Sequence, residues 1–161
     1  MVLGDYYQVL ELYYLLQTNQ IFNIRKDQEM SDKIKPIPQP ESDRYWEAAN
    51  ENKLVIQKFG DHIQFYPRAV STKDGSRDVE WIEASGKAKL YTFTIVHAAP
   101  HPSFVEDLPY IAAIVTLEEG VNMPTRIIGV EPQPENLKIG MDLIVDFINV
   151  DGQNLPVFKP A

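Results

Sequence analysis

The segment Gly86-Lys-Ala-Lys-Leu-Tyr-Thr-Phe-Thr-Ile-Val-His97 decides the fold, because its residue types alternate along the chain. Alternation of this kind gives a β-strand two unlike faces. One predicted face carries Leu90, Thr92, Thr94 and Val96. The opposite face carries Lys87, Lys89, Tyr91, Phe93, Ile95 and His97. The segment therefore predicts a strand whose two sides meet different surroundings.

Further extended segments follow this strand, separated by Gly, Pro or acidic turn residues. Residues 110–117 are largely apolar, 121–130 contain Pro124, and 141–150 supply another long strand. Pro124 indicates an edge strand or a bulge, because proline cannot donate a backbone hydrogen bond. A short strand over 155–159 is expected to complete the set. Several strands with turns between them and no helical period predict a small, closed or nearly closed antiparallel barrel.

Composition narrows the possible functions. The 161 residues fit one compact domain, or one domain with a small appendage. A formal charge of -8 is unfavourable for binding nucleic acid, because that affinity rests on Lys and Arg neutralising phosphates. The chain has no cysteine, which excludes disulfides and thiolate metal sites. Since the chain shows no export signal, we expect a cytoplasmic protein.

Residues 1–29 differ in character from the rest of the chain. The run 2–16 is rich in Tyr and Leu, but polar and acidic residues interrupt it, so it is too short and too polar to span a bilayer. One interpretation is an amphipathic helix that docks on a partner. We prefer another, in which residues 1–29 are a non-native or disordered extension and translation begins at Met30.

Residues 30–53 are expected to form a strap and a helix. The alternate prolines of Lys35-Pro-Ile-Pro-Gln-Pro40 favour an extended, polyproline-like segment that lies across a surface. Ser42 is a suitable N-cap for a short helix over 43–52. One face of that helix would carry Tyr45, Trp46 and Ala49. Such an aromatic pair can grip a ligand, but we favour an anchor against the body of the domain.

The order of these features resembles a known family, the acyl-CoA-associated proteins that join a rubredoxin-like zinc ribbon to an OB fold, long catalogued as a domain of unknown function. The resemblance covers residues 35–160 and rests on the order and spacing of several segments. These are KPIPQPESDRYWEAANENKLVIQK, FYPR, WIEASGKAKLYTFTIVH, LPYIAAIVTLEEG, LKIGMDLIVDF and LPVFKP. The resemblance implies a mainly β chain: a short helix, a ribbon over 54–80 and a five-stranded OB-fold barrel over 81–161.

The chain departs from this family at the metal site of the ribbon. Where the family has two Cys-x-x-Cys knuckles for zinc, this chain has Phe59 and His62 in the first and Ser71 and Asp74 in the second. Structural zinc requires four ligands in a tetrahedral array, and His62 with Asp74 would leave half of that shell empty. We therefore expect a degenerate ribbon without zinc or another cofactor. Phe59 would fill the space of the metal and sulfurs by apolar burial.

The resemblance also implies a function. Its members look like accessory subunits of thiolase-superfamily enzymes in acyl-CoA, lipid or steroid metabolism. The partner enzyme carries the reactive groups, and the ribbon and barrel hold or channel acyl-CoA. By position, Tyr66, Arg68 and Phe104 are candidate contacts for coenzyme A. Arg68 would pair a phosphate or form a structural salt bridge, and Phe104 would meet the pantetheine arm or a partner, or cap the barrel end.

The first barrel strand offers a second candidate surface. Lys87, Lys89, Tyr91 and Phe93 are predicted to put cationic and aromatic groups on one side. Such a face can stack an adenine and meet the phosphates of coenzyme A, or it can track single-stranded nucleic acid. In the alternative, the aromatic rings are barrel core and the lysines lie outside. The acidity of the chain favours coenzyme A, which leaves a nucleic-acid-binding OB protein as the runner-up.

Catalysis by the chain itself is the weakest hypothesis. His97 and His101 lie near Glu106 and Asp107 in sequence, and a histidine beside a carboxylate can serve as a general base. No nucleophile is paired with them, and the sequence has no nucleophile elbow and no phosphate-binding glycine loop. An independent hydrolase that uses His97 is therefore our third hypothesis.

Overall fold

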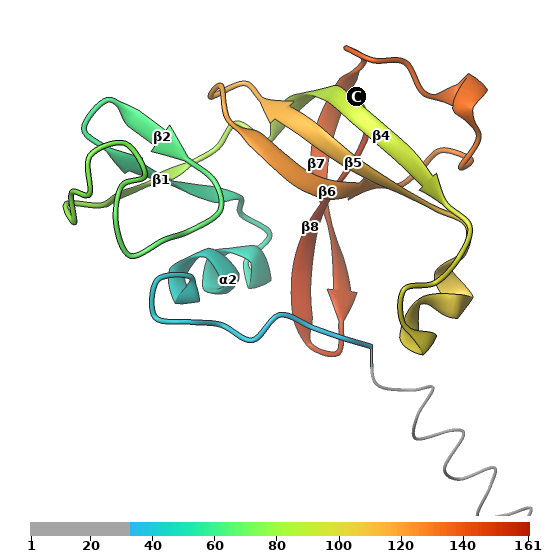
Figure 1. Cartoon of the computed structure of the whole chain (residues 1–161), viewed down its shortest axis with the longest axis horizontal. Coiled ribbons are helices and arrows are strands. Elements are labelled where there is room, and N and C mark those ends of the chain that lie inside the picture. The colour runs from blue at the N-terminus through green and yellow to red at the C-terminus, as the bar shows by residue number, and fades with distance from the viewer. Residues whose placement is uncertain (1–32) are drawn as a thin grey trace, which may run out of the picture.

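The computed structural model describes residues 33–161 (Figure 1). The interpretation of residues 1–29 as a non-native or disordered extension falls outside the described residues and stays a prediction. Within the described part, no helix is both long and apolar enough to cross a membrane.

Five strands close into a barrel, which confirms the predicted mainly β, OB-fold architecture. In barrel order they are β4 (Lys87–Val96), β5 (Tyr110–Leu117), β6 (Asn122–Ile127), β8 (Gln153–Pro160) and β7 (Asp142–Val150). Neighbouring strands pair antiparallel, except that β6 and β8 run parallel. β6 lies between β5 and β8 in the closed barrel, so it is not the edge strand that Pro124 suggested. Its one pair with β8 is at Ile127, so Pro124 interrupts no ladder with β8.

Alternate side chains of the barrel strands meet in one core. In β5 every second residue from Ile111 to Leu117 is buried. Leu90, Leu143 and Phe158 reach the same core from β4, β7 and β8. This period of two is the pattern expected of a sheet with one face on the core.

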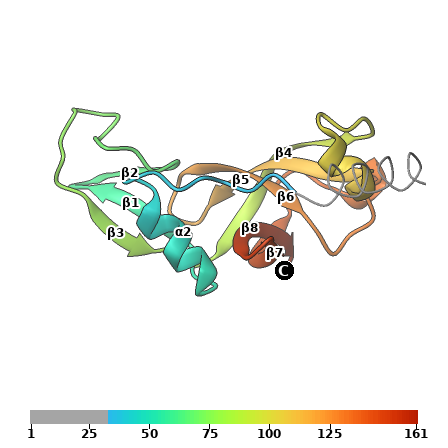
Figure 2. The same ribbon diagram turned by 90° about the horizontal axis from the view of Figure 1, so that it is seen from below.

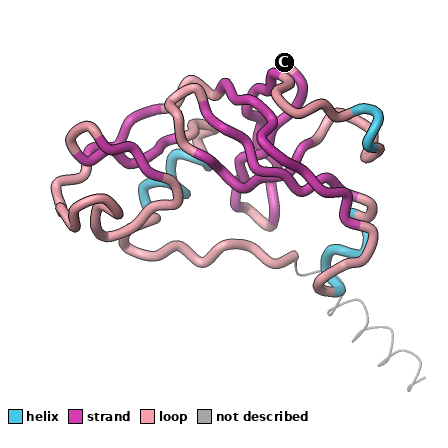
Figure 3. The backbone as a smooth tube through the Cα atoms, turned by 45° about the horizontal axis from the view of Figure 1, so that its top comes forward, coloured by secondary structure: helices cyan, strands magenta, loops and turns pink. Residues whose placement is uncertain are grey.

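A three-stranded sheet, the ribbon, precedes the barrel. Its strand order is β2 (His62–Gln64), β1 (Val55–Phe59) and β3 (Glu80–Glu83). Trp81 belongs to β3, and the first barrel strand, β4, begins at Lys87, so residues 84–86 connect the two sheets. Figure 3 shows the strands of both sheets, with long loops at the outer end of the ribbon.

Helix α2 (Asp43–Asn50) joins the ribbon to the barrel. Its buried residues are Tyr45, Trp46 and Ala49, as the sequence predicts. They share one hydrophobic cluster with ribbon and barrel residues. Gln153 of β8 donates hydrogen bonds to the Trp46 carbonyl at 3.3 Å and to Asn50 Oδ1 at 3.0 Å. The aromatic pair of α2 therefore anchors the helix to both sheets.

An extended strap leads into α2. It starts beside the short 3-10 helix η1 (Pro102–Asp107) and runs past the turn between β7 and β8 (Figures 1 and 2). Lys33 Nζ lies 2.9 Å from Asp107 Oδ1, and Lys35 Nζ donates to the Asp151 carbonyl at 3.1 Å. Two lysines thus fasten the strap to the barrel. A second short 3-10 helix, η2 (Pro134–Asn136), lies between β6 and β7.

A β-bulge breaks the alternation of β4 at Tyr91. Leu90 pairs with Val115, and Thr92 pairs with Ile114, so two steps along β4 match one step along β5. Tyr91 is the additional residue. From Thr92 onward, each side chain of β4 therefore points to the side opposite the one that strict alternation predicts.

The bulge corrects the predicted arrangement of the candidate binding face. Beyond it, Phe93 pairs with the buried Ala113 and packs against the core. Lys87, Lys89 and Tyr91 are exposed. The prediction that Phe93 shares a face with these three residues is therefore wrong, and Phe93 is part of the barrel interior.

Candidate functional site

The two degenerate knuckles of the ribbon remain adjacent, but they do not form a metal site. His62 Nε2 lies 2.9 Å from the Thr72 hydroxyl. Hydrogen bonds from the Ser76 backbone and the Ser71 side chain lower the pKa of Asp74. Among residues 33–161, no group of three or more His, Cys, Asp and Glu side chains is placed to hold a metal ion. The residues present thus do not fit zinc, and Phe59 is buried with 4% of its surface exposed.

Two buried glutamines connect the ribbon strands to its loops. Gln64 Nε2 donates to Gln57 Oε1 at 3.0 Å. Gln57 accepts from the Arg68 backbone N–H at 2.8 Å and donates to the Arg68 carbonyl at 3.0 Å. Gln64 Oε1 accepts from the N–H and hydroxyl of Thr72. The glutamine pair ties both the Phe65-Tyr-Pro-Arg68 linker and the second knuckle to the sheet. Sequence reasoning missed this pair.

The linker meets α2 in an aromatic cluster. Tyr66 accepts a 3.0 Å hydrogen bond from Trp46 Nε1, and its ring centre lies 5.7 Å from that of Tyr45. Burial raises the pKa of the Tyr45 phenol, and the nearby Tyr66 adds to this effect. Tyr66 nevertheless keeps 40% of its surface exposed. Arg68 uses its backbone in the ribbon, while its side chain is exposed, so the guanidinium is available to an anion.

The lysines at the start of β4 lie beside carboxylates. Lys89 Nζ lies 2.7 Å from Asp142 Oδ1, and Lys87 Nζ lies 4.0 Å from Glu118 Oε1. Tyr91, with 58% of its surface exposed, stands beside them. These ion pairs reduce the attraction of this end of β4 for phosphates.

The far end of the barrel holds a network of charged and aromatic side chains. Asp107 accepts from Lys33 and from Arg126 Nη1, each at 2.9 Å. Partial burial alone would raise the pKa of Asp107, but the hydrogen bonds from these two cations outweigh it and hold the pKa below its ordinary value. The Arg126 guanidinium lies 4.5 Å from the centre of the Tyr110 ring, and Phe104 lies 6.5 Å from the same ring. Phe104 is half-buried there. No motif in the sequence marked Arg126.

The histidines do not form the acid–base pairs considered from the sequence. His101 Nδ1 lies 2.9 Å from the Ser103 hydroxyl and accepts from the Ser103 N–H, where it caps η1. Asp107 is engaged by Lys33 and Arg126 instead. In the described part of the chain, no carboxylate is hydrogen-bonded to His97 or His101.

The seven candidate contacts for coenzyme A lie in three separate places. Tyr66 and Arg68 belong to the junction between the ribbon and α2, and Phe104 lies in η1. In Figure 1 the ribbon and η1 occupy opposite ends of the barrel. The remaining residues, Lys87, Lys89, Tyr91 and Phe93, are in β4. The structure therefore does not combine the seven into one site.

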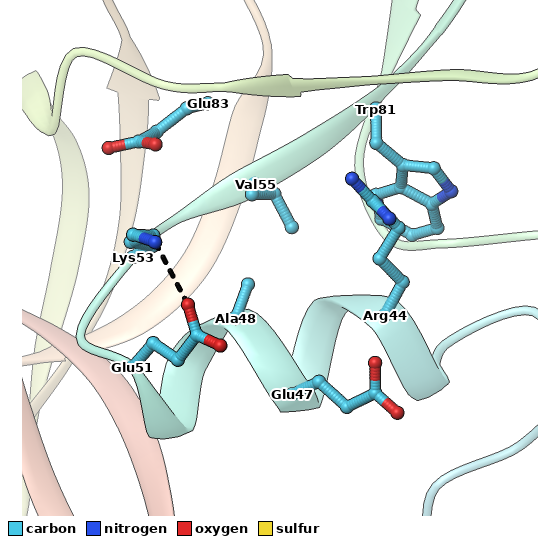
Figure 4. Close-up of a pocket in the computed structure, with 8 residues that line it drawn as sticks. All are labelled: Arg44, Glu47, Ala48, Glu51, Lys53, Val55, Trp81 and Glu83. Atoms are coloured by element: carbon cyan, nitrogen blue, oxygen red, sulfur yellow. Dashed lines mark hydrogen bonds and ion pairs between the residues drawn. The ribbon is translucent and has the colours of Figure 1, made fainter.

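An open pocket of about 310 Å³ lies between α2, β1 and β3 (Figure 4). Trp81 and Val55 provide its apolar surface. Its charged lining residues are Arg44, Glu47, Glu51, Lys53 and Glu83. A 2.9 Å ion pair joins Lys53 to Glu51. The carboxylates outnumber the cations, so the pocket is unfavourable for the phosphates of coenzyme A.

Comparisons with known proteins agree with this architecture. Residues 81–147 match the family described as ChsH2, C-terminal OB-fold domain. A chain of the solved Ltp2-ChsH2(DUF35) aldolase superposes with a TM-score of 0.69 and 32% identity, covering 78% of this chain and 98% of that one. This chain belongs to the DUF35 family. The resemblance stated from the sequence is thereby confirmed.

Two curated relatives of this DUF35 chain carry different names. A DUF35 domain-containing scaffold protein of Pyrococcus furiosus is 36% identical over 102 residues, which cover 62% of this chain and 73% of the relative. A Thermomonospora curvata protein named "Probable enoyl-CoA hydratase alpha subunit" is 33% identical over 148 residues, covering 87% of this chain. This DUF35 chain spans 45% of the length of that Thermomonospora protein.

Proposed function

We propose that this DUF35 chain is a non-catalytic subunit that assembles with a thiolase-superfamily enzyme and handles acyl-CoA in lipid or steroid metabolism. One observation carries the proposal: the chain aligns with 98% of a chain of the solved Ltp2-ChsH2(DUF35) aldolase. The names of the other relatives, a scaffold protein and an enoyl-CoA hydratase subunit, support a scaffold that serves acyl-CoA chemistry.

The arrangement of ionisable side chains supports a role without covalent chemistry. General acid–base catalysis requires a base held by a partner near the reacting atoms. Within residues 33–161, neither His97 nor His101 has a carboxylate partner, and Asp107 is engaged by two cations. We therefore assign the reactive groups to the partner enzyme, and we propose that this chain works without zinc.

The junction between the ribbon and α2 is our proposed contact for coenzyme A. Arg68 offers an exposed guanidinium, which suits a phosphate because its donors form a planar fork. Tyr66 offers an exposed ring edge two residues away, and its hydrogen bond from Trp46 fixes its position. Lys87 and Lys89 are weaker candidates because carboxylates already lie beside them.

Affinity capture from the source cells tests the assembly. The tagged full chain should retain a thiolase-superfamily enzyme at comparable abundance, identified by mass spectrometry. A folded, abundant bait that retains no such enzyme would contradict the proposal. Capture of nucleic-acid-processing proteins would contradict it as well.

Calorimetric titration of the purified complex with acetyl-CoA tests the ligand contact. Arg68→Ala should weaken binding about 10-fold, the scale of one charge-assisted hydrogen-bonded contact. Arg77→Ala is the matched control, because Arg77 is also an exposed arginine of the ribbon region. Equal affinities for the two variants would show that Arg68 does not bind the phosphates.

We do not propose the runner-up function, binding of single-stranded nucleic acid, because the lysines of β4 are paired with Asp142 and Glu118. Fluorescence anisotropy with a labelled oligothymidine provides the check. Binding that falls steeply between about 50 and 200 mM salt would support the nucleic-acid function instead.

A further inference from the structure

The outer side of β5, β6 and the part of β4 beyond its bulge carries few charged residues, and Lys89, which pairs with Thr116, lies at its edge. Antiparallel partners point to the same side of a sheet, so the pairs Thr94 with Ala112 and Ala112 with Arg126 place all three side chains outward. Ile114 and Pro124 form the next outward pair. We call the outward residues of 92–96, 110–116 and 122–126 the outer sheet face.

The composition of the outer sheet face differs from that of the whole chain. Charged residues make up 24% of the sequence, yet Arg126 is the only one among these outward positions. A sheet face in contact with water normally carries polar and charged side chains. The centre of a protein–protein interface is instead depleted in Lys, Asp and Glu and enriched in Tyr and Arg. The outer sheet face has the composition of an interface centre.

Nothing in the described part of the chain packs extensively over this face. Helix α2 contacts β8 and β1, and the ribbon strands β2 and β3 pair with β1. Figure 1 looks onto β4, β5 and β6, and no ribbon crosses in front of them. The outside of a closed barrel curves outward, and such a surface suits a large partner better than a small molecule, which needs a concave site.

One end of the face carries a rigid anchor. Arg126 stacks over Tyr110 at 4.5 Å and is held by Asp107 at 2.9 Å, so its guanidinium is positioned before any partner arrives. Its side chain remains 29% exposed. Arg and Tyr are frequent hot spots of protein interfaces, particularly when they are preorganised.

We propose that the outer sheet face is the surface on which the partner enzyme docks, an inference that rests on the proposed function. The occupant is a folded enzyme subunit with a similarly uncharged face. A polyanion does not suit this surface, because Arg126 is paired with Asp107 and the neighbouring Lys89 is paired with Asp142. An enzyme subunit does suit it, because the aligned chain occurs in an aldolase named for two components, Ltp2 and ChsH2(DUF35).

A charge-introducing double variant tests the docking surface. Thr94→Lys with Ile114→Lys places two cations in the middle of the outer sheet face, where docking would bury them unpaired. We expect the dissociation constant for the purified thiolase-superfamily partner, identified by the capture above, to rise about 100-fold. Val79→Lys is the control, because Val79 is an exposed valine outside the barrel. It should bind like the wild type. The thermal midpoint of each variant, measured in parallel, checks that the barrel is folded.

The outcomes separate this inference from the proposed function. If the wild type captures no thiolase-superfamily enzyme, the proposed function fails and this inference fails with it. If the wild type and the folded double variant bind the enzyme equally, docking occurs elsewhere and only this inference is overturned. It is also overturned if the double variant changes the chain from dimer to monomer in light scattering while enzyme affinity stays the same, since the face would then join two copies of the chain.

Discussion

Gln64 donates a 3.0 Å hydrogen bond to Gln57 in the interior of the ribbon, and both side chains are buried. The pair bridges β1 and β2 and also satisfies backbone groups of the linker and the second knuckle. Buried polar groups in a region of low dielectric are stable only when their hydrogen bonds are made. A connected amide network therefore holds together a ribbon whose side chains do not suit zinc.

Loss of one amide should weaken the ribbon. We expect Gln64→Ala to lower the free energy of unfolding by roughly 1–3 kcal/mol, because Gln57 and the Thr72 N–H lose a partner. Urea unfolding followed by circular dichroism measures the change. Gln133→Ala, at an exposed position, is the control and should stay within about 0.5 kcal/mol of the wild type. Equal effects in the two variants would show that the network contributes little.

Chelation should leave stability unchanged. Zinc-dependent ribbons unfold when the metal is removed, because metal binding supplies their folding free energy. Here Phe59 and the glutamine pair occupy the interior of the ribbon. We expect Tm in excess EDTA to equal Tm in excess zinc chloride, as measured by differential scanning calorimetry. A clear fall in Tm with EDTA would show that this ribbon does hold a metal.

The turn into the barrel depends on a glycine. Gly86 has φ +76, and a Cβ at this position would come within 2.7 Å of a Val145 methyl group. Gly86→Ala should therefore lower the free energy of unfolding by roughly 2–4 kcal/mol, because it adds both backbone strain and a clash. Gly140→Ala is a matched control, since Gly140 has φ +81 with no atom near its added Cβ, and it should cost only about 1 kcal/mol. Thermal unfolding of both variants checks the difference. Similar losses would mean that Val145 moves aside without cost.

The barrel could be predicted because its strands repeat a simple pattern. In β5 the alternation of burial is unbroken, and the apolar run 110–117 correctly predicted a strand, although its residue types do not show which side faces the core. In β4 the same reading fails beyond Tyr91, because a single additional residue in a strand leaves no mark in the sequence. Thr92 and Thr94 suit either face, so composition does not reveal the shift.

The residues that sequence reasoning missed are polar groups whose partners are distant in the chain. Arg126 pairs with Asp107, which lies on another element, and no local motif connects the two. Gln57 and Gln64 lie within strand segments, where a lone glutamine is indistinguishable from a solvent-facing residue. Only the fold shows that they meet, because the β1–β2 pairing sets Gln57 opposite Gln64.

Tyr66 joins a structural role to a proposed binding role, and one variant separates them. Tyr66→Phe removes the acceptor of the Trp46 N–H but keeps the ring. We expect a loss of about 1 kcal/mol in the free energy of unfolding, because Trp46 is buried and its donor loses its partner. The affinity of the complex for acetyl-CoA should be retained, because Tyr66→Phe keeps the aromatic ring that we propose contacts coenzyme A. Tyr91→Phe, at an exposed tyrosine, should not change stability. Equal stability of both variants would contradict the role of this hydrogen bond.

The network around Asp107 should make stability depend on pH in a defined direction. Partial burial raises the pKa of Asp107, but hydrogen bonds and charges from Lys33 and Arg126 together bring it below the ordinary value. Because the folded pKa lies below the unfolded one, the carboxylate contributes its full stabilisation above the ordinary carboxyl pKa of about 4. That stabilisation is lost as the pH falls through the folded pKa. The network therefore favours the folded state at neutral pH and weakens in acid.

Replacing this carboxylate should remove its share of the pH dependence. Asp107→Asn is expected to be about 1 kcal/mol less stable than the wild type at pH 7, since its cationic partners are only partly buried. The difference between the two proteins should shrink as the pH is lowered below about 4, because the wild-type carboxyl then becomes neutral as well. Urea midpoints measured across this range provide the test. Glu135→Gln, at an exposed glutamate, should follow the wild type at every pH. A constant difference between wild type and Asp107→Asn would mean that lost packing, and not the charge, causes the destabilisation.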